Sequence, residues 1–370
     1  MVRRMLYLNG MAIIAVIVFH ATGMSFVAML SWAHRYLPPG VPATSQIGSP
    51  SYFVLRVLEQ LIIFAVPAFL FVSGYFVAVA TGKNRETISW KAVGVRLKAL
   101  LIPYLLWTFV ILALQVLLEG QGLPLHRLFL SIFTGSTNEV MYFVPLLVQF
   151  YLLSPLLVRM AKKNWKLLLA VVALIQIGVQ LLPYPMFLGL DWPNATTLAN
   201  LVPKWSFPAR ILWFPLGIIF GFHLDQFKPF LQHYRWVFLA TALLAVPLGV
   251  IEWELYSRLS GQEWLSNRET LLDALYGLAV ILSFFAFAEA KLPFGRRVEN
   301  LGSRSYGIYL THAIFIQYTA RLIYHLAPKL LAYQLVLLPV FLLVGLAGPL
   351  VMMALVERTA LRRYYKLIFG

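Results

Sequence analysis

Two polar side chains with distinct chemistry interrupt an apolar stretch near the start of the chain. Residues 5–30 contain no Asp, Glu, Lys or Arg, yet they include the amide of Asn9 and the imidazole of His20. The stretch is long enough to cross a bilayer as a helix. An ionisable group at membrane depth usually faces a packed interior or a wet cavity and is usually functional. We therefore interpret His20 as the first candidate for a catalytic residue.

The spacing of these two side chains indicates the size of a ligand. Asn9 and His20 are eleven positions apart, which is close to three full helical turns. They therefore share one face of the helix, with a separation of about 16 Å along its axis. A separation of this length suits a long ligand better than a compact site.

The composition is typical of a polytopic membrane protein. Of the 370 residues, 61% are hydrophobic and 12% are charged, whereas soluble domains contain about 25% charged residues. The absence of Cys excludes disulfides, Cys-based metal sites and a thiol nucleophile. The net charge of +16 comes from basic residues in short blocks between apolar segments, so it indicates topology signals rather than nucleic-acid binding. We expect one all-α integral-membrane domain over residues 1–370, with no appended soluble domain.

The apolar segments predict about ten transmembrane helices. They cover residues 5–30, 53–80, 97–118, 141–160, 165–182, 208–224, 236–255, 271–290, 306–326 and 333–355. The segment 208–224 is expected to be irregular because Pro and Gly residues interrupt it. An even number of spans places both termini on one side of the membrane. Most Lys and Arg residues fall on that side, so the positive-inside rule makes both termini cytoplasmic.

This topology places a carboxylate at a depth similar to that of His20. The first helix runs outward and the second runs inward, which brings Glu59 toward the outer half of the membrane. A carboxylate near an imidazole can fix its tautomer and stabilise its protonated form, as in a catalytic triad. Glu59 is therefore a second catalytic candidate. The alternative is that Glu59 only neutralises Arg56 or lines a wet vestibule.

Five short motifs occur in order along the predicted segments. They are NGMAI at 9–13 leading to FH at 19–20, PAFLFVSGY at 67–75, RLKALLIPY at 96–104, YFVPLLVQFYLLSP at 142–155 and SRSYGIYLTH at 303–312. Together they resemble membrane acyltransferase family 3, within the wider transmembrane acyltransferase group that includes the lysosomal heparan acetyltransferases. The resemblance covers nearly the whole chain, and the essential histidine of the family's first helix corresponds to His20.

Two positions depart from the family's pattern. Asn9 stands where a basic residue is usual, as in some members of the wider group that include the heparan enzymes. Its contact with the acyl donor would then be an amide hydrogen bond rather than a charge-assisted one. Tyr142 stands where Trp is usual.

The resemblance implies an O-acyltransferase that uses acyl-CoA, most often acetyl-CoA, as its cytoplasmic donor. The acceptor would be a hydroxyl of an extracytoplasmic carbohydrate or lipid-linked glycan, and no metal is implied. The expected location is the bacterial inner membrane, among membrane lipids. The acceptor is either modified directly or served through a separate periplasmic partner, and a homodimer is compatible with the sequence.

The resemblance also assigns roles to individual residues. His20 would act either as a general base on the acceptor hydroxyl or as a nucleophile that carries the acyl group. Asn9 would hold the pantetheine arm, while Arg96 and Lys98 would contact phosphates, unless they serve only as topology signals. Further donor-site candidates are Ser73, Tyr75, Tyr104, Gln149, Tyr309 and His312. Ordinary interhelical hydrogen bonding is the alternative role for these polar groups.

A transporter or flippase for a glycolipid or small metabolite is the alternative function. Broken helices and polar residues near the membrane midplane are expected in that class too. Two features of the sequence argue against it. We find no internal repeat, and Glu59 is the one clear intramembrane acid available for ion coupling.

Overall fold

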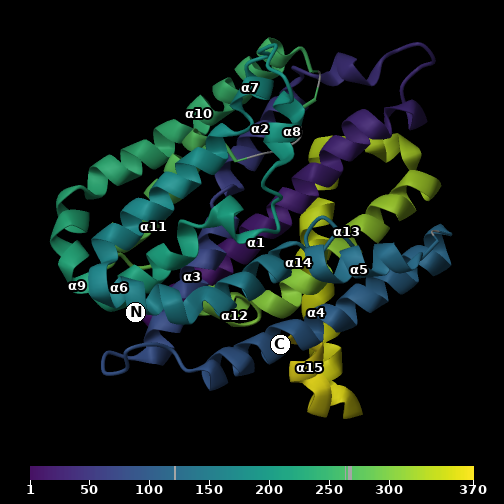
Figure 1. Ribbon diagram of the computed structural model, residues 1–370. Coiled ribbons are helices and arrows are strands. Elements are labelled where there is room, and N and C mark those ends of the chain that lie inside the picture. The colour runs from purple at the N-terminus through teal and green to yellow at the C-terminus, as the bar shows by residue number, and fades with distance from the viewer. Residues whose placement is uncertain (121, 263, 266–268) are drawn as a thin grey trace. The chain divides into compact units, whose positions relative to one another are not determined.

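The computed structural model describes the whole chain except residues 121, 263 and 266–268 (Figure 1). Its described residues form helices and connecting loops and contain no strand. The predicted all-α class is thus confirmed. Six helical stretches among these residues are long and apolar enough to cross a membrane, namely Val2–Ser31, Pro50–Thr81, Trp90–Glu119, Phe143–Phe187, Arg235–Ser260 and Gln334–Arg358. The count of ten spans and the cytoplasmic termini stay predictions.

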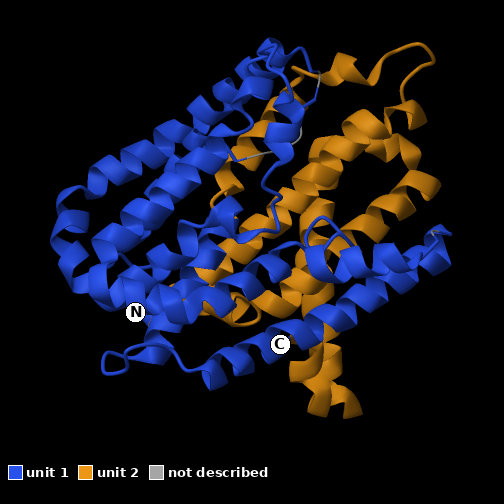
Figure 2. Ribbon diagram, in the orientation of Figure 1, with its two compact units in different colours: residues 1, 66–295, 370 blue, residues 2–65, 296–369 orange. Residues whose placement is uncertain are grey.

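The helices form two compact units, which Figure 2 shows in different colours. Unit 2 comprises residues 2–65 and 296–369, so it is built from the two ends of the chain. Its helices are α1 (Val2–Phe26), α2 (Pro50–Ile62), α12 (Gly295–Ser303), α13 (Ser305–Leu326), α14 (Gln334–Arg358) and α15 (Tyr365–Phe369). A short π-helix, Val27–Ser31, extends α1.

Unit 1 comprises residues 66–295 together with the two terminal residues. Its helices are α3 (Ala65–Thr81), α4 (Trp90–Glu119), α5 (Leu125–Thr134), α6 (Phe143–Leu181), α7 (Tyr184–Phe187), α8 (Ala195–Asn200), α9 (Trp213–His233), α10 (Arg235–Ser260) and α11 (Leu271–Ala286). Helix α6 covers nearly all of the two segments predicted at 141–160 and 165–182. A non-helical residue, Asn164, separates them, and its side chain caps the second part by accepting from the Leu167 amide.

Helix α1 is the central element of unit 2, because it contacts α2, α13 and α14. Small residues bring the backbones close together. A Cβ atom on Gly10 would collide with the Val298 carbonyl of α12, and one on Gly302 would collide with the Leu6 carbonyl of α1. Further along, Gly345 of α14 packs against Ile17. Small residues at helix contacts are the usual means of close association in membranes.

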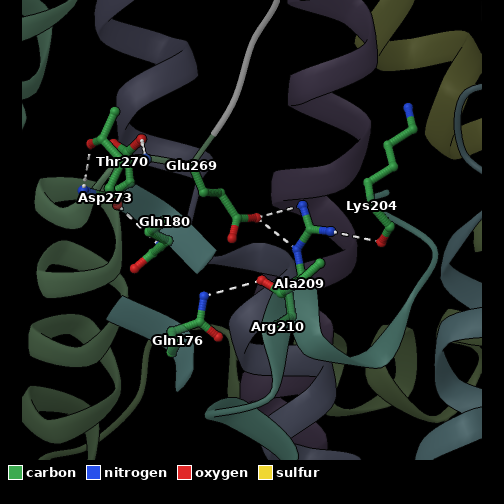
Figure 3. Close-up of polar contacts among 8 residues, drawn as sticks. All are labelled: Gln176, Gln180, Lys204, Ala209, Arg210, Glu269, Thr270 and Asp273. Carbon is green, nitrogen blue, oxygen red and sulfur yellow. Dashed lines mark hydrogen bonds and ion pairs between the residues drawn. The ribbon is translucent and has the colours of Figure 1, made fainter. Parts of the chain in front are cut away.

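Unit 1 contains a polar network that ties its loops to α6 and α11 (Figure 3). Arg210 donates from Nε and Nη2 to Oε1 of Glu269 at 2.7 and 2.6 Å, and both side chains are largely buried. The amides of Gln176 and Gln180, one turn apart on α6, donate to the carbonyl oxygens of Ala209 and Thr270. Thr270 in turn caps α11 through a reciprocal pair of hydrogen bonds with Asp273. The network therefore fixes two loop ends that would otherwise rely on apolar contacts.

The close approach of α1 to α12 predicts opposite effects for one substitution at two positions. Gly10→Ala should destabilise the protein by about 1–3 kcal/mol, because the added methyl group meets the α12 backbone. Gly23→Ala in the same helix meets nothing within 4 Å and should be neutral or stabilising by up to about 1 kcal/mol. Thermal unfolding of both variants in detergent micelles measures the difference. Equal stability of the two variants would contradict the packing described.

The buried ion pair of unit 1 gives a second stability prediction. Glu269→Gln should cost about 3 kcal/mol, because it leaves the Arg210 guanidinium buried without its counter-charge. The matched control is Asp225→Asn, whose partner Lys228 is 57% exposed, so that loss of this solvent-screened pair should leave the unfolding midpoint nearly unchanged. Unfolding midpoints of the two variants are compared with that of the wild type. A similar small shift for both would show that the Arg210–Glu269 pair has little effect on stability.

Candidate active site

The structure brings together two histidines that lie 292 positions apart in the sequence. His20 of α1 is half-buried and His312 of α13 is fully buried, and both belong to unit 2. Their ring centroids are 5.2 Å apart, with an angle of 50° between the ring planes. Tyr309, one turn before His312, has its ring centroid 6.1 Å from that of His312. Three residues predicted separately from the sequence therefore form one cluster.

The hydrogen bonds of His312 define its tautomer. Nδ1 lies 3.1 Å from the carbonyl oxygen of Ile308 and 2.8 Å from that of Tyr309. A carbonyl oxygen only accepts hydrogen bonds, so Nδ1 carries the proton and the neutral ring has its lone pair on Nε2. Nε2 is buried and has no hydrogen-bond partner among the described residues. Leaving a buried acceptor unpaired costs about 1–3 kcal/mol.

Asn9 clamps α1 to the junction of α12 and α13. Its Nδ2 donates to the Gly302 carbonyl oxygen at 3.2 Å and to Oγ of Ser305 at 2.9 Å. These two bonds use both amide hydrogens, so the side chain can offer a ligand its carbonyl oxygen alone. The predicted donor contact at Asn9 would therefore be to an N–H or O–H group of the ligand.

Glu59 lies on α2 in an ion pair with Arg56. Nη1 of Arg56 is 2.9 Å from Oε2 of Glu59, and the two side chains are 7% and 12% exposed. The same guanidinium lies over the rings of Phe26 and Tyr52, and its Nε donates to the Tyr52 hydroxyl. This geometry matches the alternative in which Glu59 neutralises Arg56. The role of Glu59 as the orienting acid of His20 stays a prediction.

Two of the donor-site candidates in unit 1 lie near each other. Arg96 of α4 donates to the Phe76 carbonyl oxygen at 3.1 Å, and its guanidinium lies 5.8 Å from the ring of Tyr151. The Tyr151 hydroxyl interacts with the side chains of both Arg96 and Ser73. Tyr75, on the same helix as Ser73, is buried beside Gly217 of α9, and Lys98 is exposed.

Tyr104 and Gln149 make structural contacts. The Tyr104 hydroxyl lies 2.9 Å from the carbonyl oxygens of Ser131 and Ile132, which attaches α5 to α4. The Gln149 amide donates to the Trp205 carbonyl oxygen at 2.8 Å and accepts from the Phe207 amide at 3.1 Å. Both residues thus make the kind of hydrogen bond that was the alternative to ligand binding, and their donor-site roles stay predictions.

A cleft of about 290 Å³, lined by charged and polar residues, opens at the N-terminal parts of α1 and α12 in unit 2. Its walls are formed by Arg3 of α1 and by Arg296, Glu299 and Asn300 of α12. The sequence predicts the basic residues here only as topology signals. It does not predict the contact between α1 and α12, which no pattern in either segment indicates.

The described residues contain no group of three or more His, Cys, Asp or Glu side chains that could hold a metal ion.

Comparison with known proteins relates this geometry to a family. No curated protein and no solved structure matches the chain. The sequence model of acyltransferase family 3, described as an acyltransferase domain, matches residues 5–356. The match includes Asn9, His20 and His312, and it confirms the resemblance stated from the five motifs. Because it covers nearly the whole chain, the protein belongs to the family 3 membrane acyltransferases.

Proposed function

We propose that this protein is a membrane O-acyltransferase that transfers an acyl group, most often acetyl, from cytoplasmic acyl-CoA to a hydroxyl of an extracytoplasmic carbohydrate or lipid-linked glycan. The observation that supports this proposal most is the pairing of a half-buried His20 with a fully buried His312 on contacting helices. An imidazole in this position can exchange a proton with a substrate, which an apolar helix contact cannot do. The proposed location is the bacterial inner membrane.

His20 supplies the proton acceptor that the reaction needs. As the acceptor oxygen attacks the thioester carbonyl, its hydroxyl proton moves to a ring nitrogen of His20. The C–S bond then breaks, and the leaving thiolate takes a proton to give CoA. In the second route the His20 nitrogen itself attacks the thioester and then passes the acyl group to the hydroxyl. Both routes consume one acyl-CoA and one alcohol and release one ester and one CoA.

We place the donor along α1. The cleft at Arg3 lies six residues before Asn9, or about 9 Å along the helix axis, and Asn9 lies about 16 Å before His20. The phosphopantetheine arm has thirteen bonds from phosphorus to sulfur. At about 3.6 Å for three bonds of an extended chain, this arm spans about 16 Å. A thioester at His20 therefore brings the pantetheine phosphate to the level of Asn9 and the nucleotide to the cleft.

In this arrangement the cleft contacts the nucleotide end of the donor. The guanidinium groups of Arg3 and Arg296 would bind the phosphate on its ribose, because guanidinium binds phosphate through charge-assisted hydrogen bonds. The free carbonyl oxygen of Asn9 would accept from a donor group of the pantetheine arm near that phosphate, such as its hydroxyl. Arg96 and Lys98 remain the other proposed phosphate contacts, and Ser73, Tyr75, Tyr104, Gln149 and Tyr309 remain proposed donor-site residues.

The first test of the function is transfer of a labelled acyl group. Inverted membrane vesicles that contain the wild type should move label from acetyl-CoA to a glycan in the vesicle lumen. His20→Ala should lower this rate at least about 100-fold, because it removes the proton acceptor. The control is His233→Ala, which changes an exposed histidine at the end of α9 and should leave transfer unchanged.

Equal labelling by the wild type and His20→Ala would contradict the role of His20. Absence of labelling in both, with glycolipid or metabolite crossing the vesicle membrane, would support the transporter. Glycan analysis of a strain that lacks the protein then identifies the acceptor.

The second test concerns the cleft. Arg296→Gln should raise the KM for acetyl-CoA by about 10-fold or more, since it removes a charged hydrogen bond to phosphate. It should have little effect on the KM for acetyl-3′-dephospho-CoA, which lacks the phosphate in question. The matched control is Arg297→Gln, because Arg297 is exposed and does not line the cleft. If both variants behave alike, or if Lys98→Gln has the larger effect, the phosphate lies elsewhere.

A further inference from the structure

We infer that His312 is the positioning residue of His20, and that its buried Nε2 accepts a hydrogen bond from one ring N–H of His20 and so leaves the other nitrogen of His20 unprotonated toward the substrate. This inference rests on the proposed function of His20. It assigns the orienting role to a neutral imidazole instead of a carboxylate.

The tautomer of His312 leaves its Nε2 as a buried hydrogen-bond acceptor. Its Nδ1–H is committed to the carbonyl oxygens of Ile308 and Tyr309 within its own helix. The ring is fully buried, and Nε2 has no partner among the described residues. A buried acceptor without a partner costs free energy, so a donor is expected beside it.

The distance between the rings of His20 and His312 fits a hydrogen bond between them. An N–H···N hydrogen bond between two imidazoles needs about 3 Å between the nitrogen atoms. Each nitrogen lies about 1.1 Å from the centre of its own ring, because the ring C–N bonds are about 1.33 Å long. With a nitrogen of each ring directed at the other, the two ring centres would be about 5.2 Å apart, and the observed separation of the ring centroids is 5.2 Å. The bond forms by rotation of the His20 ring about its last side-chain torsion, which is soft because it joins sp³ and sp² atoms.

The charge of Glu59, the other candidate for orienting His20, is neutralised by Arg56. Glu59 is held by Arg56 at 2.9 Å, and that guanidinium is itself enclosed by Phe26 and Tyr52. A carboxylate neutralised in this way has little net charge to offer a neighbouring imidazole. His312 can instead select the tautomer of His20 without placing a net negative charge beside it.

The tautomer has a direct chemical consequence. A neutral imidazole has one N–H and one lone pair. With its N–H bound to His312, the lone pair of His20 faces the acceptor hydroxyl or the thioester. Loss of that bond removes the preference for this tautomer that His312 supplies, so a larger share of the molecules presents an N–H where a base is needed. In serine proteases the loss of the corresponding group lowers kcat by about 10⁴-fold, through the wrong tautomer.

Two substitutions separate positioning from packing. His312→Asn keeps a donor for the helix carbonyls but removes the acceptor at the position of Nε2, whereas His312→Gln can place its carbonyl oxygen there. We expect kcat for labelled acetyl transfer to fall about 100-fold in His312→Asn, with the KM for acetyl-CoA unchanged. His312→Gln should stay within about 10-fold of the wild type. A purely structural role of His312 does not predict that Asn lowers kcat more than Gln does. The inference would be overturned by full activity of His312→Asn or by an equal loss of activity in both variants.

A second measurement does not depend on activity. In full-length protein with ¹⁵N-labelled histidine, the ¹⁵N shifts of His20, assigned by their loss in His20→Ala, report its tautomer. The wild type should show one tautomer and His312→Asn a mixture, at equal thermal stability. A single tautomer of His20 in both would also overturn the inference. If instead His20→Ala still transfers acyl groups, the proposed catalytic role of His20 fails, and the tautomer measurement still decides whether His312 positions His20.

Discussion

The close backbone contact between α1 and α12 is the constraint on which the candidate site depends. Gly10 and Gly302 leave no room for a side chain between the two helices, and Asn9 adds two hydrogen bonds across the same junction. Because α13 begins directly after α12, this junction fixes the start of α13 against α1. From that point both helices run as regular α-helix through their histidines, so His20 and His312 are placed by rigid elements rather than by loops.

Many polar side chains in the described part of each unit are paired, as an apolar surrounding requires. In unit 1, Gln176 and Gln180 donate hydrogen bonds to carbonyl oxygens of loops, and Arg210 donates to Glu269. In unit 2, Arg56 and Glu59 satisfy each other. Water is scarce inside the bilayer, so an unpaired polar group is expensive there. The Nε2 atom of His312 is one of several buried side-chain atoms of the described residues that lack a hydrogen-bond partner, and it belongs to an ionisable ring, a kind of group that usually marks a function inside a membrane.

The helical class and the main candidate could be predicted from the sequence because both depend on local patterns. Long apolar runs predict helices, and one imidazole in an apolar run stands out wherever the helix lies. The break at Asn164 also falls between two segments that were predicted as separate. The i to i+3 spacing of Arg56 and Glu59 allowed their ion pair to be stated as an alternative.

The pairing of His20 with His312 could not be predicted, because nothing in either segment specifies which helices become neighbours. The cleft at Arg3 and Arg296 was missed for the same reason, since its walls come from opposite ends of the chain. Helix α13 is also not among the six stretches that are long and apolar enough to cross a membrane, although it was predicted as a span. The polar side chains that give it chemistry, such as Thr311 and His312, also lower its hydropathy.

The clamp made by Asn9 has an evolutionary consequence. Both hydrogen bonds of the clamp are donated by the short Asn9 amide. An arginine at position 9 could also donate to these oxygens, but its longer side chain would not place its N–H groups where the amide places them. Positions 9 and 305 should therefore covary among homologues, with each lineage keeping one compatible pair.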